Sequence, residues 1–375
     1  MLDKTIFSYK DLEIKLTDHA NEKVLELLDR TVLGSEGGMR YALQNISERI
    51  KIYHDRIRFI SLYKKNKVTG TIGSCFRHAR LGDKSFMCSY IRYLAVHSGY
   101  QSDFTRRELR REKIKPEKED SFKHKTLELF GKPSVLEVEG LTDSDKHIMY
   151  AYVESMNERS KNLVNQAGYE QIRSFLTVAF SRFSPKRSIS VSGITDDEKP
   201  EMLNLLSNYY KGHSMYTGEF VFREGNYYVL REGGKIIAGV NAIPNKYKVY
   251  HVPGVWGWIF MKILPYLPYY RRLFQPGEFR FLVFDSVYCQ EGEEKKLERL
   301  FESVCSLEGF NTGLTWLDDR SMLYEKLKTG VNMGVLNRML NAKPGIVFAK
   351  FVNFTDKEKE PFYDSPVFIT GVDIT

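Results

Sequence analysis

Cysteine and histidine are the residue types in this chain that most readily bind metals or act as nucleophiles, and their spacing argues against both roles. The sequence holds four cysteines and eight histidines. The cysteines form no CxxC pair and have no histidine at metal-ligand spacing; they are Cys75, Cys88, Cys289 and Cys305. A zinc module is therefore not expected, and the sequence offers no catalytic triad and no phosphate-binding P-loop. We predict that the protein uses no metal.

Positive charge is concentrated in the first half of the chain. Residues 1–185 hold 32 Lys and Arg against 25 Asp and Glu, whereas residues 186–375 hold 24 against 23. Such an excess attracts anions, whether nucleic acid or a phosphorylated cofactor. Because the sequence contains no nucleic-acid-binding motif, we expect no nucleic-acid partner.

Two unusual segments interrupt the pattern of strands and helices. Residues 105–113 are rich in Arg and Glu, which is typical of a solvated surface and also suits contact with phosphates. Residues 255–274 contain two of the three tryptophans. We expect this segment to be largely buried as a cover over the core; an apolar wall for an acceptor or acyl tail and an interfacial membrane contact are the alternatives, in that order.

The compartment follows from what the sequence lacks. Residues 1–4 have no apolar signal-peptide region, and no apolar run approaches the ~18 residues that span a membrane. Lys262 and two prolines interrupt the aromatic segment 255–274, so this segment is not expected to be a membrane-spanning helix. Few cysteines in a long chain fit a reducing environment. The sequence therefore predicts a cytoplasmic protein without a spanning segment.

The elements that would position a site occur twice. A short strand and a polar cap precede an amphipathic helix expected over residues 21–28, and the same order precedes a second helix over residues 198–206. Thr195 and Glu198 have the spacing of a capping box. Residues 91–101 then parallel residues 279–290, and residues 157–163 parallel residues 318–324. Three matches in one order predict a tandem repeat with domains at 1–185 and 186–375.

Each copy also contains a predicted antiparallel meander. In the first, strands are expected over 58–63, 68–76 and 86–96; in the second, over 227–231, 235–242 and 279–284. Together with the motifs Leu-Ala-Val-His-x-x-Tyr-Gln at 94–101 and Asn-x-x-Ser-x-x-Leu at 157–163, this order resembles the GNAT N-acetyltransferase superfamily. The resemblance implies an α/β (α+β) fold with two GNAT-like domains, each a twisted, mostly antiparallel mixed sheet flanked by helices.

The resemblance also implies a place for acetyl-CoA as co-substrate. In each copy the sheet would splay open, after Val96 and after Phe284, so that unpaired backbone amides bond the pantetheine and polarise the thioester. The pyrophosphate would rest on the next helix N-terminus. The implied cofactor-binding residues are Leu94, Ala95, Val96, Gln101, Ser102, Asn157, Ser160, Leu282, Phe284, Gln290 and Gly292. Both copies depart from the family's glycine-rich turn after Gln101 and after Gln290.

The same resemblance assigns the acid and the base. The family commonly has a tyrosine acid and sometimes a carboxylate base at positions that hold Tyr324 and Glu278 in the second copy. The first copy holds Val164 and Tyr90 there, and neither suits the role. The alternative role of Tyr324 is packing in the core, and Glu278 could equally be an ordinary surface residue.

These features predict a transferase: an acyl-CoA-dependent N-acetyltransferase that moves an acetyl group directly to a primary amine of a small molecule or peptide. The alternative is a non-catalytic, degenerate tandem GNAT scaffold that binds a ligand or partner. The missing glycines favour that alternative, whereas the pair Tyr324 and Glu278 favours the enzyme.

Overall fold

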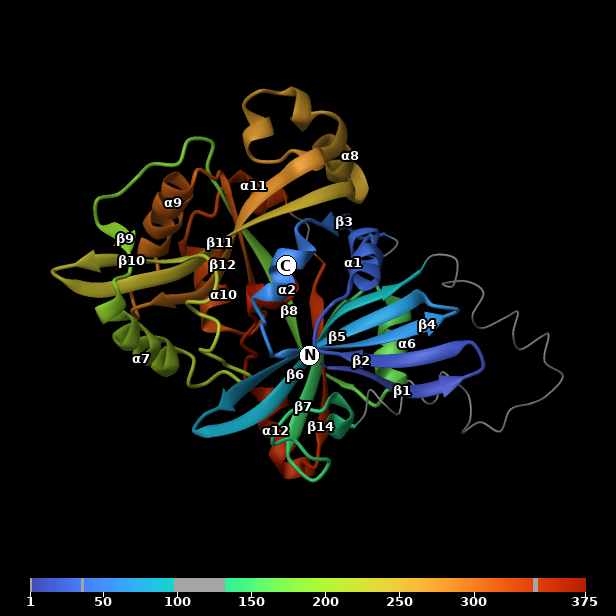
Figure 1. Ribbon diagram of the computed structural model, residues 1–375. Helices are drawn as coiled ribbons and strands as arrows, with labels where there is room; N and C mark the ends of the chain where they lie inside the picture. The colour runs from blue at the N-terminus through green and yellow to red at the C-terminus, as the bar shows by residue number, and fades with distance from the viewer. Residues whose placement is uncertain (1, 35–36, 98–131, 340–342) are drawn as a thin grey trace.

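Alternating apolar and polar residues produce the strands that dominate this chain. The structure, a computed structural model, describes residues 2–34, 37–97, 132–339 and 343–375. Within these residues, 14 strands join in one sheet, in the order β1-β2-β4-β5-β6-β7-β14-β8-β13-β12-β11-β10-β9, with β3 paired to β11 (Figure 1). The strands are β1 (Asp3–Tyr9), β2 (Leu12–Thr17), β3 (Arg40–Leu43), β4 (Ile57–Lys64), β5 (Lys67–Leu81), β6 (Lys84–Val96), β7 (His147–Glu154), β8 (Glu170–Ser181), β9 (Val191–Gly193), β10 (Asn226–Glu232), β11 (Lys235–His251), β12 (Phe279–Cys289), β13 (Thr312–Asp318) and β14 (Gly345–Val352).

The two predicted meanders are confirmed. Strands β4, β5 and β6 pair antiparallel in sequence order, as do β10, β11 and β12. Lys65 and Asn66 both have positive φ at the first turn, as tight hairpins require. Each meander is followed by a parallel neighbour, β7 beside β6 and β13 beside β12. The mixed, mostly antiparallel character of the sheet follows from these pairings.

Strands from the two halves of the sequence exchange places at the centre of the sheet. β14 lies between β7 and β8, and β8 also pairs with β13 along seven residues. Each half therefore completes its sheet with a strand of the other half. The division into domains at 1–185 and 186–375 stays a prediction.

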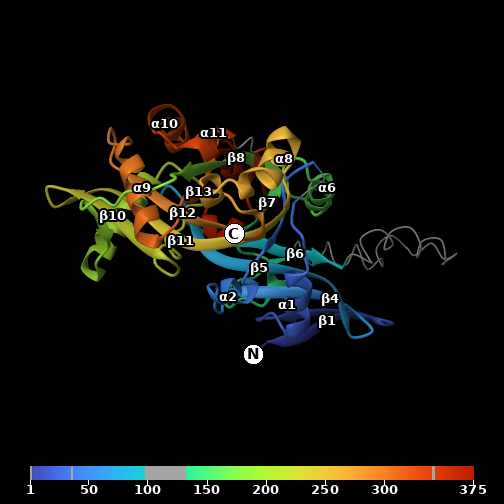
Figure 2. The same cartoon turned by 90° about the horizontal axis from the view of Figure 1, so that it is seen from above.

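Helices cover both faces of the sheet. They are α1 (Glu22–Asp29), α2 (Ile46–Lys51), α6 (Glu158–Gln166), α7 (Lys199–Tyr209), α8 (Gly254–Lys262), α9 (Lys296–Glu308), α10 (Met322–Gly330), α11 (Val335–Met339), α12 (Asp356–Asp364) and α13 (Gly371–Ile374). Figure 2 shows α1 and α2 on one side of the sheet, with α6, α10 and α11 on the other. α13, the last helix, is buried between the two halves of the sheet.

Two helix starts bear on the sequence analysis. Asn157 caps α6 by accepting a hydrogen bond from the Ser160 N–H at 3.1 Å, and Thr195 with Glu198 forms the expected capping box. The corresponding cap of α10 is Ser321, three residues beyond the aspartate that the sequence repeat aligns with Asn157. No helix of the described residues is both long and apolar enough to cross a membrane.

The two copies of the repeat lie on the expected strands, but the residues that the sequence aligns are not structurally equivalent. β6 carries a bulge at Tyr93 and β12 carries one at Ser286, where φ is 54° and 47°. Arg92 directly precedes the first bulge, and Asp285 directly precedes the second. The sequence repeat instead aligns Arg92 with Arg280, which lies six residues before its bulge. The alignment therefore identified equivalent strands and was wrong about equivalent residues.

Candidate active site

The sheet splits open first between β6 and β7. The two strands pair only from Met87 with His147 to Tyr90 with Tyr150. Beyond that point β6 stays with β5, while β7 continues along β14. The split thus begins after Tyr90, six residues earlier than the predicted opening after Val96. The bulge at Tyr93 follows directly, and bulges commonly redirect side chains and free backbone groups beside active sites.

An equivalent split lies between β12 and β13. Their pairing is limited to Leu282 with Gly313 and Val283 with Leu314, so the strands separate from Phe284 onward, one residue from the predicted opening. In both halves the parallel pairing ends three residues before the bulge. Two splits with the same geometry therefore exist, one in each half.

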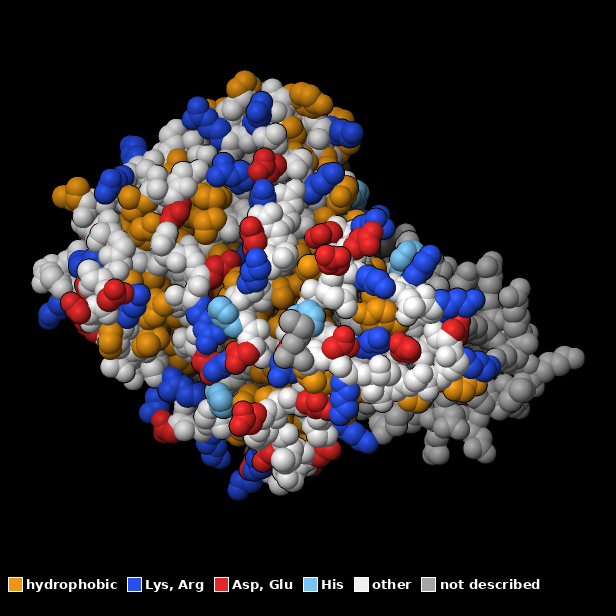
Figure 3. Space-filling view, in the orientation of Figure 1, with side chains coloured by type: hydrophobic (Ala, Val, Ile, Leu, Met, Phe, Trp, Pro, Cys, Tyr) orange, Lys and Arg blue, Asp and Glu red, His pale blue; other side chains and the backbone are white. Residues whose placement is uncertain are grey.

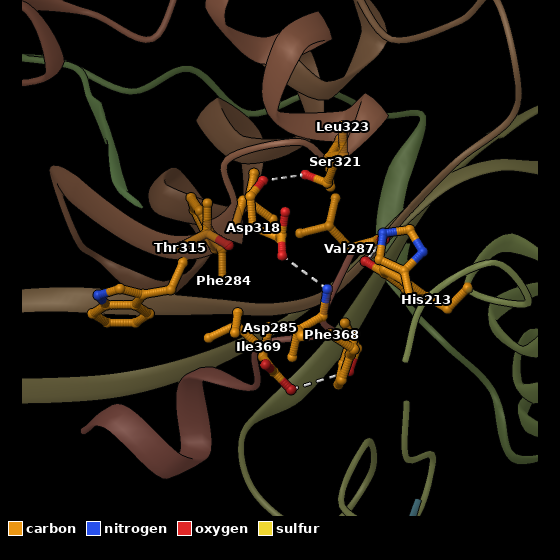
Figure 4. A pocket seen from close by; sticks show the side chains of 15 residues that line it. His213, Phe284, Asp285, Val287, Thr315, Asp318, Ser321, Leu323, Phe368 and Ile369 are labelled. Atoms are coloured by element: carbon orange, nitrogen blue, oxygen red, sulfur yellow. Dashed lines mark hydrogen bonds between the residues drawn. The ribbon is translucent and has the colours of Figure 1, made fainter. Parts of the chain in front are cut away.

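The second split is closed by the chain itself. Residues 367–369 line it together with the diverging strands and leave a cavity of only about 20 Å³, room for about one water. Figure 4 shows Asp285, Asp318 and His213 around this cavity. The Val367 N–H donates to Asp318 at 2.9 Å. Burial lowers the pKa of His213 to about 4, so this imidazole is neutral at physiological pH.

Aspartates on both strands hold the closing segment. Asp318 accepts from Arg173 Nε at 2.9 Å, inside a buried ion pair. Asp285 accepts from the Gly371 N–H at 2.7 Å, and burial raises the pKa of its carboxyl. Substrate entry into the second split would have to displace these buried bonds.

Beside the first split, arginines bind the last residues of the chain. Arg92 donates to the Val372 carbonyl at 2.6 Å and to the Tyr53 hydroxyl at 2.5 Å. Arg77 pairs with Asp373 through two bonds of 2.9 and 2.5 Å, and both side chains are at most 1% exposed. Burial alone would lower the pKa of Arg77, but Asp373 and nearby tyrosines raise it above its ordinary value. Both guanidinium groups are therefore permanently charged in the interior.

A set of buried polar atoms close to these arginines has no hydrogen-bond partner among the described residues. It includes the Tyr93 hydroxyl, the Tyr247 hydroxyl and the Oε2 atom of Glu224. The positive charges of Arg49 and Arg92 act to lower the pKa of all three side chains. Unsatisfied buried polar groups are costly, and several together indicate a place where a ligand or water completes the bonds. These three residues, together with Arg49 and Arg92, form what we call the interior polar cluster.

Local backbone geometry fixes Glu224 in that cluster. Gly225 has φ of +73°, and a Cβ there would meet the Ala242 carbonyl oxygen at 2.3 Å, so only glycine fits. Asn241 donates to the Glu224 carbonyl at 3.0 Å. Glu224 Oε1 lies 3.6 Å from an Arg49 nitrogen. Burial raises the pKa of Glu224, with Arg49 and Arg92 opposing the change.

The structure does not bring Tyr324 and Glu278 together. Glu278 directly precedes β12, its side chain is 55% exposed, and Lys246 Nζ lies 3.9 Å away. Tyr324 lies on α10, which follows the far end of β13. Because β12 and β13 are parallel, the two residues start from opposite ends of the pair. The Tyr324 ring packs on the core and carries Lys328 Nζ at 5.7 Å from its centre.

The predicted cofactor residues of the first half lie along the split strand or outside the described residues. Leu94 and Val96 follow the bulge and are 39% and 40% exposed, whereas Ala95 is buried. Asn157 and Ser160 form the α6 cap described above. Gln101 and Ser102, and the charged segment 105–113, lie outside the described residues.

Those of the second half lie in the core or in an acidic loop. Leu282 and Phe284 are buried, with Phe284 stacked on Phe301 at 4.6 Å between ring centres. The Gly292 N–H donates to the Glu294 carboxylate at 3.3 Å, and Gln290 is exposed next to this loop. Carboxylates around a helix start repel phosphate rather than bind it.

Sequence reasoning missed Glu224, Arg49 and Tyr247. None belongs to a motif, and their proximity arises from the fold. The one available signal was Glu-Gly at 224–225 directly before a strand pattern, which indicates a constrained turn and no particular chemistry.

Comparison with solved structures finds proteins of similar fold. Saccharomyces cerevisiae N-myristoyltransferase with bound myristoyl-CoA is similar over 98% of this chain and 91% of its own, with a TM-score of 0.55 and 10% identity. The same yeast enzyme with bound myristoyl-CoA and inhibitors has a TM-score of 0.55 and 10% identity, over 98% of this chain and 88% of its own. A GCN5-related N-acetyltransferase from Anabaena variabilis gives 0.46 and 11%, over 91% and 73%. No protein-family model and no curated protein matches the sequence.

These likenesses, at such low identity, concern the fold. The predicted fold class, a mixed and mostly antiparallel α/β structure flanked by helices, is confirmed. The chain shares the fold of Saccharomyces cerevisiae N-myristoyltransferase along nearly its whole length.

Proposed function

We propose that the protein is an acyl-CoA-dependent N-acyltransferase whose acyl-CoA site is the split between β6 and β7. The observation that carries this proposal is the split itself: a parallel pair that separates three residues before a bulge, in a fold shared with an enzyme that binds myristoyl-CoA. The partly exposed apolar residues Leu94 and Val96, on the edge of β6 that β7 leaves unpaired, suit a pantetheine arm. The closed second split and its acidic loop suit it less.

The chemistry requires one proton acceptor and one proton donor. The amine nitrogen attacks the thioester carbonyl carbon, the C–N bond forms as the C–S bond breaks, and the ammonium proton must leave. Glu224 is the proposed base, because its pKa is raised by burial and one of its carboxyl oxygens has no hydrogen-bond partner in the part of the chain that the structure describes. A carboxylate with a raised pKa works well as a base near neutral pH. CoA leaves as a thiolate, which takes a proton from water or from the Tyr93 hydroxyl.

The assignment of Tyr324 as acid and Glu278 as base remains the competing proposal, and it would move the reaction to the second half. Acetyl-CoA is the donor implied by the sequence resemblance, and a longer acyl-CoA is the donor suggested by the yeast complexes. The acceptor is proposed to be a primary amine of a small molecule or peptide.

The direct test is release of free CoA in the presence of a panel of primary amines. Acetyl-CoA and myristoyl-CoA are supplied in turn, with polyamines, amino sugars and short peptides as acceptors, and mass spectrometry identifies the amide. Thiol release that needs both donor and amine supports the function. Absence of release with every pairing would favour the non-catalytic scaffold.

Replacing Leu94 by aspartate should weaken acyl-CoA binding by ~10-fold or more. A charged carboxylate in the first split would lie against the thioester arm, and the desolvation penalty of a polar group is ~1–3 kcal/mol. Calorimetric titration with acyl-CoA measures the change. Leu203→Asp, at an equally exposed leucine on α7 (37% exposed), is the control and should bind normally. Equal affinity of both variants would contradict a site in the first split.

A further inference from the structure

The aromatic segment between β11 and β12 exposes several large apolar side chains, among them Trp258, although the sequence predicts a largely buried element. The side chain of Trp256 lies outside the described part of the structure. The segment forms α8 followed by short 3₁₀ turns and projects as a lobe at the top of Figure 1. Its exposed apolar residues, which we call the lobe surface, are Val255, Trp258, Ile263, Tyr266, Leu267 and Tyr269. Trp258 is 60% exposed and Tyr266 is 82% exposed. Several large apolar side chains exposed on one segment suggest an interaction site.

Packing against the rest of the protein holds the lobe in place, and this packing determines which of its side chains are exposed. Phe260 and Leu264 are buried on the opposite side of the segment, and Phe260 contacts Phe274 with 5.1 Å between ring centres. Tyr269 stacks on Phe183 at 4.1 Å. Within α8, Val255 and Trp258 are three residues apart and share one face, whereas Phe260 is two residues from Trp258 and lies on the other face. Leu264 belongs to the 3₁₀ turn that follows α8.

Positive charge surrounds the lobe surface. Between residues 246 and 280 the sequence holds six basic residues and one acidic residue, Glu278. The basic residues are Lys246, Lys248, Lys262, Arg271, Arg272 and Arg280. Figure 3 shows apolar side chains at the top of the molecule with Lys and Arg beside them. The rest of the second half, residues 186–245 and 281–375, holds 18 basic against 22 acidic residues, so the positive excess of this half is confined to the region of the lobe.

We propose that the lobe surface binds the interface of an anionic phospholipid membrane, with Trp258 and Tyr266 inserted at the headgroup level and Arg271 and Arg272 on the lipid phosphates. Basic residues close to an exposed apolar surface are attracted to the negative potential of an anionic membrane. Tryptophan and tyrosine favour the headgroup level because one end of the ring is apolar and the other is polar. Six basic residues against one acidic residue between 246 and 280 fit a surface that carries net negative charge, as anionic lipid does.

Co-sedimentation of the full chain with vesicles tests this inference. We expect binding to phosphatidylcholine vesicles with about a quarter phosphatidylserine, and weak binding to pure phosphatidylcholine, because anionic lipid attracts each nearby basic residue. Arg271→Glu with Arg272→Glu should lower the partition coefficient ~20-fold or more. Trp258→Ser with Tyr266→Ser should lower it ~10-fold or more by removing the inserted apolar area.

Matched variants outside the lobe give the controls. Ile189→Ser removes a fully exposed apolar side chain, and Lys295→Glu with Lys357→Glu reverses two exposed charges; both should bind vesicles like the unchanged protein. Equal partition of lobe and control variants would overturn the proposal. So would absence of vesicle binding together with self-association, in ultracentrifugation, that Trp258→Ser abolishes, since that would make the lobe a protein contact.

Discussion

Replacing Arg77 by methionine is expected to lower the free energy of unfolding by about 3–5 kcal/mol, because it leaves Asp373 charged and unpaired in the interior. The pair is fully buried, with two hydrogen bonds, and Tyr150 adds a third to Asp373 at 3.1 Å. These bonds fix α13 between the halves, beside the first split. Chemical denaturation of the purified variant measures the loss.

Two further variants interpret that result. Arg30→Met removes an exposed arginine that directly follows α1 and pairs with Glu26 of that helix, and it should cost less than ~0.5 kcal/mol. Arg77→Met combined with Asp373→Leu removes both charges and should recover much of the lost stability. A loss in Arg77→Met no greater than in Arg30→Met would show that the buried pair does not hold the interior together.

Replacing Glu224 by glutamine is expected to lower turnover ~100-fold or more, with acyl-CoA binding unchanged. Glutamine keeps the shape of the side chain but cannot accept the ammonium proton. Since burial raises the pKa of Glu224, activity of the unchanged protein should fall as pH drops through that raised pKa, where the carboxylate becomes protonated. The variant should lose this acid limb of the profile.

Glu278→Gln is the matched control, because it makes the same chemical change at an exposed position. We expect it to retain activity, as we do for Tyr324→Phe. The reverse pattern, with Glu224→Gln active and either of the other two variants impaired ~100-fold, would place the reaction in the second half and support the assignment made from the sequence.

The strands were predictable from the sequence and the registers were not. Alternation of apolar residues over 57–64 and 226–232 is a local property, so the meanders could be recognised. The bulges at Tyr93 and Ser286 depend on pairing with β5 and β11, which are separate strands. Matching Arg92 with Arg280 followed residue similarity and could not detect that these residues lie one and six positions before their bulges.

The interior polar cluster lay beyond sequence reasoning for the same reason. Glu224 meets Arg49 because a glycine turn, β11 and α2 converge at the centre of the fold. In contrast, the caps at Asn157 and Thr195 involve residues three apart and were correctly anticipated. The aromatic segment was expected to be buried because composition alone gives apolar area; the helical spacing that buries Phe260 necessarily turns Trp258 outward.

Thermal denaturation with and without acyl-CoA tests the central proposal, acyl-CoA binding by this fold, most directly. The unchanged protein is measured alone, with acetyl-CoA, with myristoyl-CoA and with free CoA. A ligand present at 100 times its dissociation constant should raise the free energy of unfolding by ~2.7 kcal/mol, and we expect this for at least one acyl-CoA. An unchanged melting temperature with both acyl-CoA donors at millimolar concentration would contradict the account.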